Sequence, residues 1–170
     1  KAGSAAKLGL DYSNLKKMKS DLIYGEITGF GDSARIAYDV VLQAESGFLS
    51  MCGEPGGKPV KMPVALIDLL AAHQLKEGLL LALLGKERNG KGAKVSVSLY
   101  DAALASLANQ ATNYLMANHI AQAMGTLHPN IAPYGECFAC QAGKMIVLAV
   151  GNDKQFAALC HLLDLADLAK

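Results

Sequence analysis

The sequence has no surplus of charge of either sign, so it gives no support for a partner recognised mainly by charge. Lys and Arg total 16 among the 170 residues, against 15 Asp and Glu. Proteins that bind nucleic acids or anionic membrane surfaces usually carry a clear excess of basic residues. We therefore predict no nucleic-acid partner and no membrane partner.

The chain also lacks an uninterrupted apolar stretch of about 18 residues, the length needed to cross a bilayer. Lys76 and Glu77 break the longest candidate. A signal-peptide pattern is absent as well, because Lys1-Ala2-Gly3-Ser4 leads directly into sequence of structural character. From these observations we expect a cytoplasmic protein, and a chain that begins partway through a larger one.

The four cysteines do not have the spacing of an extracellular disulfide framework. Cys137 and Cys140 form a C-x-x-C pair, but a zinc site needs a second half, and only Cys160-His161 and the isolated Cys52 could supply it. A thioredoxin-like pair should open a helix, whereas the residues after Cys140 are typical of a hairpin turn and a strand. We interpret all four as reduced thiols of an intracellular protein and predict no metal site.

What the sequence does have is a globular composition, with 52% apolar and 18% charged residues and enough length for a domain with a core. Periodicity and capping signals predict helices at 11–19, 38–51, 69–84, 101–118 and 152–163. Asp11 or Ser13 is expected to cap the first of these helices and Asn152 the last, and His73 is expected on the polar side of the helix at 69–84. Strands are expected at 22–28, 95–99 and 145–150, and loops at 53–59 and 125–134. This order of helices and strands is typical of an α/β or α+β protein.

A lookalike of the phosphate-binding P-loop occurs at 85–92. Gly92 stands where that motif needs a Ser or Thr to hold magnesium, and the segment joins a helix to a strand instead of a strand to a helix. We therefore interpret 85–92 as a basic turn.

One acid, Asp68, interrupts the apolar run from Pro63 to Ala72. Burying a charge without a partner is costly, so this carboxylate should cap a helix, pair with another group or do chemistry. Aspartate is a favoured N-cap, and the residues alone favour capping of the helix that follows. The two roles are compatible, because the positive end of a helix also stabilises a working carboxylate.

Several stretches, in this order over nearly the whole chain, resemble the class III CoA-transferases, the family of formyl-CoA and carnitine CoA-transferases. They are K-L-G-L-D-Y (7–12), L-I-Y-G-E-I-T-G-F-G (22–31), Y-D-V-V-L-Q-A (38–44), G-E-P-G-G-K-P-V-K (53–61), V-A-L-I-D-L (64–69), G-K-G-A-K-V-S-V-S-L-Y-D-A (90–102), A-N-Q-A-T-N-Y-L (108–115), H-P-N-I-A-P-Y (128–134) and V-G-N-D-K-Q-F (150–156). The last three look most like members that use dicarboxylic acyl groups, such as succinyl or glutaryl transferases.

The resemblance implies an α/β fold in which residues 1–121 are part of a Rossmann-like large domain that carries the catalytic Asp, and 122–170 are the start of a smaller α+β domain. The N-terminal half of the Rossmann-like domain would be missing, so the chain would be a fragment that could be inactive on its own. Family members are dimers with interlocked subunits, and we expect such a homodimer of the full-length protein.

The resemblance also implies a reaction, the transfer of CoA from an acyl-CoA thioester to a carboxylic acid through an aspartyl-CoA thioester on Asp68. Coenzyme A and acyl-CoA would be substrates, and no cofactor would be permanently bound. In this chemistry one carboxylate replaces another carboxylate of similar leaving ability, so an aspartate suits the role of nucleophile.

Tyr38 and Asp39 match the family's pair of a tyrosine and an acid near the active site, which implies a substrate-binding role. The alternative is a packing tyrosine followed by an acid at a helix end. Related racemases carry a histidine in the first position to move the α-proton, and a tyrosine with a pKa near 10 cannot readily do so. A racemase or hydrolase of the same family, or a non-catalytic dimerisation module, remain the alternative functions.

The loop at 125–130 matches the place of a glycine-rich flap in formyl-CoA transferases. His128 and Asn130 stand where those enzymes have glycines. We hypothesise that both side chains bind the acceptor carboxylate or shield the intermediate. The alternative is a loop of fixed shape with polar residues exposed at its tip.

Overall fold

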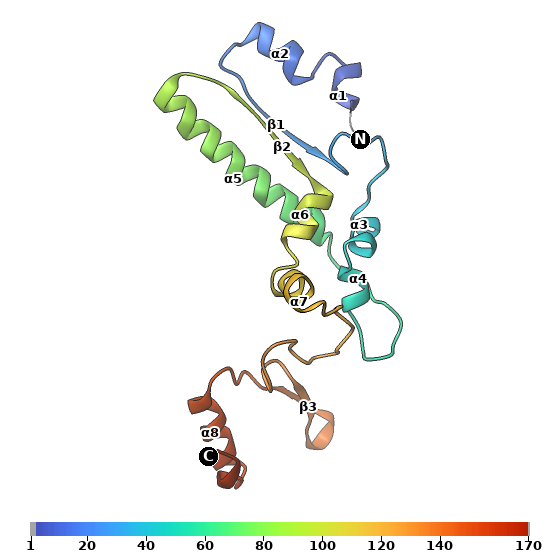
Figure 1. The fold of residues 1–170 in the computed structure, drawn as a ribbon, viewed down its shortest axis with the longest axis vertical. Coiled ribbons are helices and arrows are strands. Elements are labelled where there is room, and N and C mark those ends of the chain that lie inside the picture. The colour runs from blue at the N-terminus through green and yellow to red at the C-terminus, as the bar shows by residue number, and fades with distance from the viewer. Residues whose placement is uncertain (1–2, 170) are drawn as a thin grey trace. The chain divides into compact units, whose positions relative to one another are not determined.

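The computed structural model describes residues 3–169, which form two compact units. The first contains the residues up to Ser50 together with Val60–Ala121, and the second contains Met51–Pro59 together with the residues from Gln122 onward. Both units combine helices with a small sheet, so the fold is mixed α/β (Figure 1).

The sheet of the first unit is a parallel pair of strands joined by a long helix. Strand β1 (Ile23–Thr28) pairs with β2 (Ala93–Ser98) in a register that runs from Ile23↔Ala93 to Thr28↔Ser98. Helix α5 (Leu66–Asn89) lies along both strands (Figure 1). Parallel strands need such a crossover connection, because a tight turn cannot join them.

A glycine in the middle of α5 permits the close approach of helix and sheet. A Cβ atom added to Gly78 would lie 2.5 Å from Cγ1 of Val95 on β2. Glycine costs helix stability at such a position, and the close packing of helix on strand explains why it is nevertheless there.

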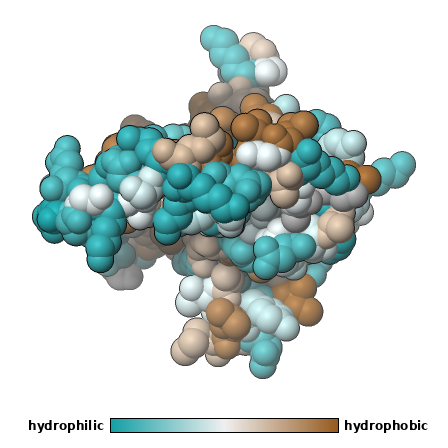
Figure 2. Space-filling model, turned by 90° about the horizontal axis from the view of Figure 1, so that it is seen from above, coloured by the Kyte–Doolittle hydropathy of each residue, from teal (hydrophilic) through white to brown (hydrophobic). Residues whose placement is uncertain are grey.

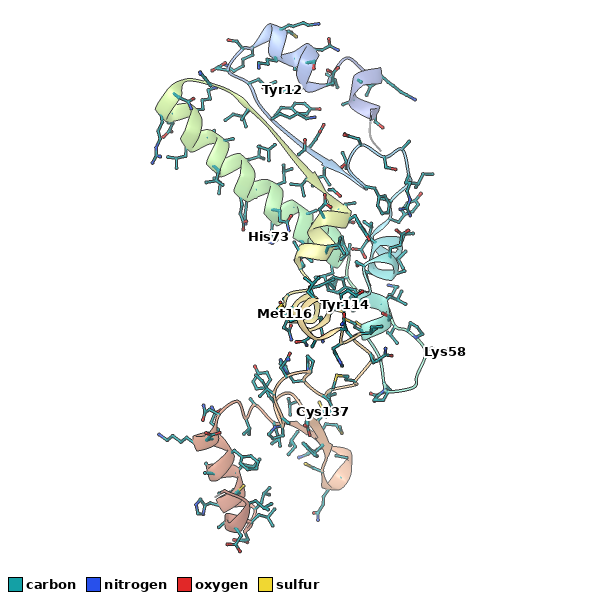
Figure 3. The ribbon with its side chains drawn as sticks, in the orientation of Figure 1. Tyr12, Lys58, His73, Tyr114, Met116 and Cys137 are labelled. Atoms are coloured by element: carbon teal, nitrogen blue, oxygen red, sulfur yellow. The ribbon has the colours of Figure 1, made fainter. Side chains whose placement is uncertain are left out.

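Shorter helices complete the first unit: α1 (Ser4–Lys7), α2 (Tyr12–Met18), α3 (Asp39–Glu45), α4 (Phe48–Met51), α6 (Leu99–Ala105) and α7 (Asn109–Ala117). Asp11 caps α2 as predicted, since its carboxylate accepts a hydrogen bond from the backbone amide of Ser13 at 3.0 Å. The ring of Tyr12, labelled in Figure 3, packs against that of Tyr24 with centroids 5.9 Å apart, which ties α2 to β1.

The core of the first unit lies where α3, α5 and α6 meet. Leu42, Ile67 and Ala103, one from each helix, are fully buried. Half-buried apolar residues surround them: Phe30, Ala37, Phe48, Leu70, Leu99 and Tyr100. Because Ile67 is a core residue, the first turn of α5 is anchored immediately beside Asp68.

The second unit contains an antiparallel hairpin and a capped helix. Strand β3 (Cys137–Ala139) pairs with β4 (Met145–Val147) across the short turn η1 (Gln141–Gly143), so the predicted turn and strand after Cys140 are confirmed. Helix α8 (Asp153–Leu162) begins after Asn152, whose side chain accepts a hydrogen bond from the amide of Gln155 at 3.0 Å, again as predicted. The turn η2 (Ala166–Ala169) follows.

Two predicted helices are in fact each divided in two. The helix expected at 38–51 breaks between α3 and α4 at Gly47. The φ angle of Gly47 is 93°, a value that glycine adopts readily and that is incompatible with a continuous α-helix. The helix expected at 101–118 breaks between α6 and α7, where Ala108 has a φ of 50°. Before that break, the Ser106 hydroxyl donates to the carbonyl of Ala102 at 2.7 Å, a contact that often bends helices.

The prediction of a basic turn at 85–92 was wrong for its first part. Helix α5 continues through Gly85 to Asn89 and ends at Gly90, which has a φ of 69° and donates its amide to the carbonyl of Lys86 at 2.7 Å. This is the common left-handed glycine termination of a helix.

Several large apolar side chains remain exposed on the first unit. Leu81 on α5 is 70% exposed and Met116 on α7 is 82% exposed. Apolar groups interrupt the hydrophilic surface in the space-filling view (Figure 2). Over residues 3–169, none of the helices is both long and apolar enough to cross a membrane.

Candidate functional site

An open cleft of about 440 Å³ in the first unit contains the candidate nucleophile. One wall is the start of α3, the other is the segment that leads into α5, and Asp68 comes from the first turn of α5. The lining residues are Tyr38, Asp39, Val40, Lys61, Met62, Pro63, Val64, Ala65 and Asp68. The structure therefore brings together the three predicted residues Tyr38, Asp39 and Asp68.

Asp68 is not the N-cap of α5, and that prediction was wrong. The N-cap residue is Ala65, and Asp68 is the third residue of the helix, within its first turn. Within residues 3–169, no side chain or backbone amide donates a hydrogen bond to the Asp68 carboxylate, which lies exposed at the cleft. Its oxygens are thus available to a molecule that enters the cleft.

The capping role is taken by Asp39, from the start of α3. Its Oδ2 accepts hydrogen bonds from the backbone amides of Ile67 at 2.7 Å and of Asp68 at 3.4 Å. A carboxylate at this position satisfies amides that the helix itself leaves unpaired and interacts favourably with the helix dipole. The acid that sequence reasoning placed beside the substrate therefore also holds the helix that carries Asp68.

A buried amide supports Asp39. Gln43, one turn further along α3, is only 1% exposed. Its Nε2 donates to Oδ1 of Asp39 at 2.5 Å, and its Oε1 accepts from the backbone amide of Met62 at 2.8 Å. Met62 and Asp39 both line the cleft, so the Gln43 side chain connects the segment before α5 to the start of α3.

The surroundings of Asp68 make its carboxylate more basic than usual. Partial burial raises its pKa, and the nearby negative charge of Asp39 raises that pKa further. In its ionised form, a more basic carboxylate is a better nucleophile than an ordinary one.

Two other side chains give the cleft an apolar edge and a positive charge. Tyr38 is 67% exposed and makes no side-chain cap at the start of α3. Lys61 is exposed, and within the described residues it has no ion-pair partner. The residues that line the cleft therefore include one lysine and two acids.

His128 and Asn130 lie in the loop of the second unit that precedes β3. Nδ1 of His128 accepts hydrogen bonds from the backbone amides of Asn130 and Ile131, both at 3.1 Å. Its ring also packs edge-on against Tyr134, with centroids 5.6 Å apart. Because Nδ1 is an acceptor, the neutral ring carries its proton on Nε2. The side chain fixes the loop with one nitrogen and keeps the other as a donor.

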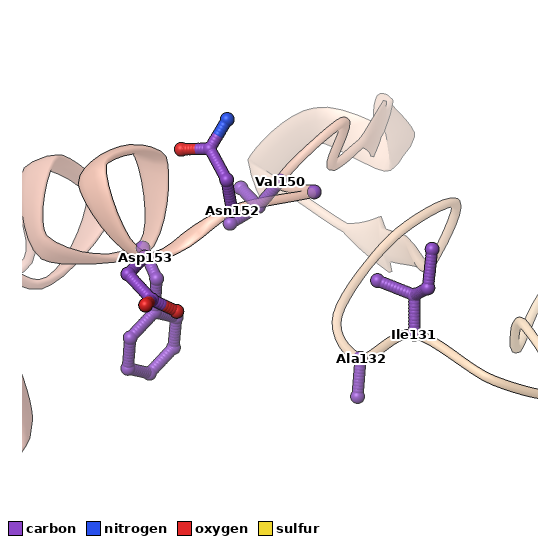
Figure 4. Close-up of a pocket in the computed structure, with 7 residues that line it drawn as sticks. Ile131, Ala132, Val150, Asn152 and Asp153 are labelled. Atoms are coloured by element: carbon purple, nitrogen blue, oxygen red, sulfur yellow. The ribbon is translucent and has the colours of Figure 1, made fainter.

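The second unit has a smaller cavity of about 260 Å³ at the start of α8. It is lined by Ile131, Ala132, Val150, Gly151, Asn152, Asp153 and Phe156. Figure 4 shows Asn152 and Asp153 pointing to opposite sides of the chain there. The side-chain carbonyl of Asn152 already caps the helix, so this cavity lacks a set of converging reactive groups.

Among residues 3–169, no group of three or more His, Cys, Asp and Glu side chains is arranged to hold a metal ion. His73 lies on the exposed side of α5 (Figure 3). Its Nδ1 is 3.0 Å from Nζ of Lys76. This agrees with the prediction that His73 belongs to the polar side of that helix.

Sequence reasoning missed Lys61, which lines the cleft, and Gln43, which is buried and hydrogen-bonds to two residues of the cleft. A signal for Gln43 was present, because a lone amide among Val40, Val41 and Leu42 stands four residues after Asp39, the spacing that places two side chains on one helix face. Lys61 offered no such signal, since it stands in a loop where an exposed lysine is ordinary.

Comparison with known proteins finds a family model and several related proteins that match this chain. The family model of CoA-transferase family III matches residues 1–170. Succinate–glutarate CoA-transferase from Agrobacterium fabrum is 39% identical over 173 residues, which cover 99% of this chain and 43% of that protein. Human succinyl-CoA:glutarate CoA-transferase is 35% identical over 170 residues, covering 98% of this chain and 38% of that protein. The chain thus spans less than half the length of these curated relatives.

A solved structure agrees with this match. The crystal structure of a CAIB/BAIF family protein from Brucella suis superposes with a TM-score of 0.80 at 38% sequence identity, and the alignment covers 98% of this chain and 45% of that one.

Proposed function

This chain belongs to CoA-transferase family III, and on that premise we propose that the protein containing it moves coenzyme A from an acyl-CoA thioester to a carboxylic acid. The observation that carries the proposal is the Asp68 carboxylate, which is open to a cleft and has a pKa raised by partial burial and by Asp39. An accessible, basic carboxylate suits nucleophilic attack on a thioester.

The proposed reaction begins when an Asp68 oxygen attacks the thioester carbonyl. The carbon–sulfur bond breaks, the CoA thiolate leaves, and a mixed anhydride joins the acyl group to Asp68. The thiolate then attacks the aspartyl carbonyl and releases the first acid as a carboxylate, which leaves an aspartyl-CoA thioester. An acceptor carboxylate repeats these steps in reverse, so that it leaves as the new acyl-CoA and Asp68 is regenerated.

The other predicted site residues have supporting roles in this proposal. Tyr38 and Asp39 lie beside the substrate, with the exposed tyrosine ring as a contact surface and Asp39 as the acid that raises the basicity of Asp68. For His128 and Asn130, which lie in the second unit, we propose binding of the acceptor carboxylate or shielding of the intermediate. The Nε2–H of His128, which is not used in holding the loop, supports this role. Coenzyme A enters only as a substrate.

We infer that the acids are dicarboxylic. The relatives from Agrobacterium fabrum and from human are named for succinate or succinyl-CoA and glutarate. The ammonium group of Lys61 at the cleft would suit the second carboxylate of such an acid.

At the level of the whole protein, we propose that residues 1–121 form part of a large, Rossmann-like domain and that 122–170 begin a smaller one. We also propose an interlocked homodimer. The exposed apolar side chains of α5 and α7, such as Leu81 and Met116, support burial against further protein.

Formation of the covalent intermediate tests the proposal. The full-length enzyme is mixed with succinyl-CoA alone, and its intact mass is measured. We expect a mass increase corresponding to CoA in the wild type and in D153N, a control acid in the first turn of another helix. No such increase is expected in D68N, and an adduct on that variant would refute the assignment.

A further inference from the structure

We propose that Gln43 is a positioning residue that ties the two walls of the cleft together and so fixes the direction of the Asp68 carboxylate. The inference rests on the proposed role of Asp68 as the nucleophile. It concerns a side chain that cannot meet the substrate, because Gln43 is buried and is not among the residues that line the cleft.

The donor and the acceptor of the Gln43 amide each face a complementary group. Nε2 can only donate and faces a carboxylate oxygen of Asp39, whereas Oε1 can only accept and faces the amide of Met62. Turning the amide over would place a donor against a donor and an acceptor against a carboxylate. Buried polar groups without partners are costly, so this arrangement strongly defines the local structure.

The chain of contacts continues from Gln43 to the nucleophile. Asp39, oriented by Gln43 through Oδ1, uses Oδ2 to hold the amides of Ile67 and Asp68. The first turn of α5 is therefore located by a buried side chain of α3, and the segment before it is located by the same side chain through Met62. Loss of the amide would loosen both walls at once.

Catalysis is sensitive to such loosening. A displacement of about 1 Å between reacting groups can cost about a hundredfold in rate. We therefore expect substitution of Gln43 to slow acylation of Asp68 by about tenfold to a hundredfold.

The variant Q43E should change the acylation rate in a pH-dependent way, which a role of Gln43 in folding alone would not produce. At low pH a single proton shared between the introduced carboxylate and Asp39 restores the donor, whereas at higher pH two carboxylates face each other and the bond is lost. Other charged or titratable groups on the elements packed around this pair are Asp68 on α5, Tyr38 and Lys61 at the cleft, Tyr100 and Asp101 on α6, and Glu45, which pairs with Arg35. These groups are shared by wild type and variant, so the ratio of the two rates isolates the new carboxylate.

The experiment measures single-turnover formation of the CoA adduct on the Asp68 peptide of the full-length enzyme, from about pH 5 to about pH 8. Variants Q43M and Q43E are compared with wild type and with Q141E, which adds the same charge at an exposed position. We expect Q43M to be slow at every pH, Q141E to match wild type, and the rate of Q43E relative to wild type to fall as pH rises.

Three results would overturn the inference. Wild-type rates in both Gln43 variants would show that the amide does not position Asp68. A ratio for Q43E that is the same at every pH would show a role in folding alone. Failure of the wild type itself to form an adduct would remove the proposed function and this inference with it, whereas the first two results leave the proposed function standing.

Discussion

Asp39 accepts a 2.7 Å hydrogen bond from the backbone amide of Ile67, 28 positions further along the chain. This bond joins the start of α3 to the start of α5, and it is accompanied by a longer one to the amide of Asp68. The acid that caps α5 is thus supplied from another helix, which leaves the carboxylate of Asp68 itself open to the cleft.

Replacing Asp39 by Asn should change both the pH dependence and the stability of the enzyme. The negative charge of Asp39 helps to raise the pKa of Asp68, so its removal should lower that pKa. The pH of half-maximal Asp68 acylation should therefore move downward, and weaker capping should cost about 1 kcal/mol of folding free energy. Adduct formation as a function of pH, with the exposed acid variant D32N as control, checks this. An unchanged profile would contradict the account.

Replacing Asp68 by Asn should stabilise the folded protein at neutral pH. Because the folded-state pKa of Asp68 is raised, the native state retains its proton where the unfolded state has lost it, and stability falls as pH rises from the ordinary value of 3.8 through the raised pKa. The variant cannot ionise, so it should unfold at a higher urea concentration than wild type at about pH 7 and show no gain at about pH 3. A loss of stability at pH 7 would refute the explanation.

Two glycines of α5 should respond in opposite directions to alanine. A methyl group at Gly78 would lie 2.5 Å from Val95, whereas nothing lies within 4 Å of one at Gly85. We expect G78A to lower the free energy of unfolding by about 1–3 kcal/mol through overpacking. G85A should raise it by up to about 1 kcal/mol through better helix propensity. Urea unfolding of both variants checks this, and equal effects would mean that β2 does not pack closely on α5.

Replacing Lys61 by Met should weaken binding of a dicarboxylic acceptor. Loss of the ammonium group at the cleft should raise KM for glutarate by about tenfold and leave kcat within about threefold. The matched control is K58M, which removes an exposed lysine that is not among the residues lining the cleft (Figure 3). An equal rise of KM in both variants would assign the effect to overall charge.

Local signals in the sequence were enough to locate β1, β2, β4 and several helix ends, although not β3. Alternation located β2, and the side chains of Asp11 and Asn152 marked the beginnings of α2 and α8. These features depend on neighbours within a few residues, which a sequence displays directly. The family resemblance, in turn, selected Asp68 and Tyr38, and the structure places both at one cleft.

Features that depend on distant contacts could not be predicted. Aspartate is a favoured N-cap residue, so the sequence pointed to Asp68 as the cap of α5. The residue that caps α5 is Asp39, which can reach it only when α3 and α5 pack together. The break at Ala108 is similar, since an alanine-rich segment favours a continuous helix and the observed φ of 50° opposes that preference. Gln43 also accepts a hydrogen bond from the backbone amide of Met62, and the pattern of residues along the sequence does not indicate that contact.

The most direct test of the account is chemical trapping at Asp68. Full-length enzyme is incubated with succinyl-CoA and hydroxylamine, whose nitrogen attacks the aspartyl carbonyl and releases CoA thiol, and the digested protein is analysed by mass spectrometry. The account predicts time-dependent inactivation and a hydroxamate on the peptide that contains Asp68. An enzyme that turns over succinyl-CoA while this peptide stays unmodified would contradict it.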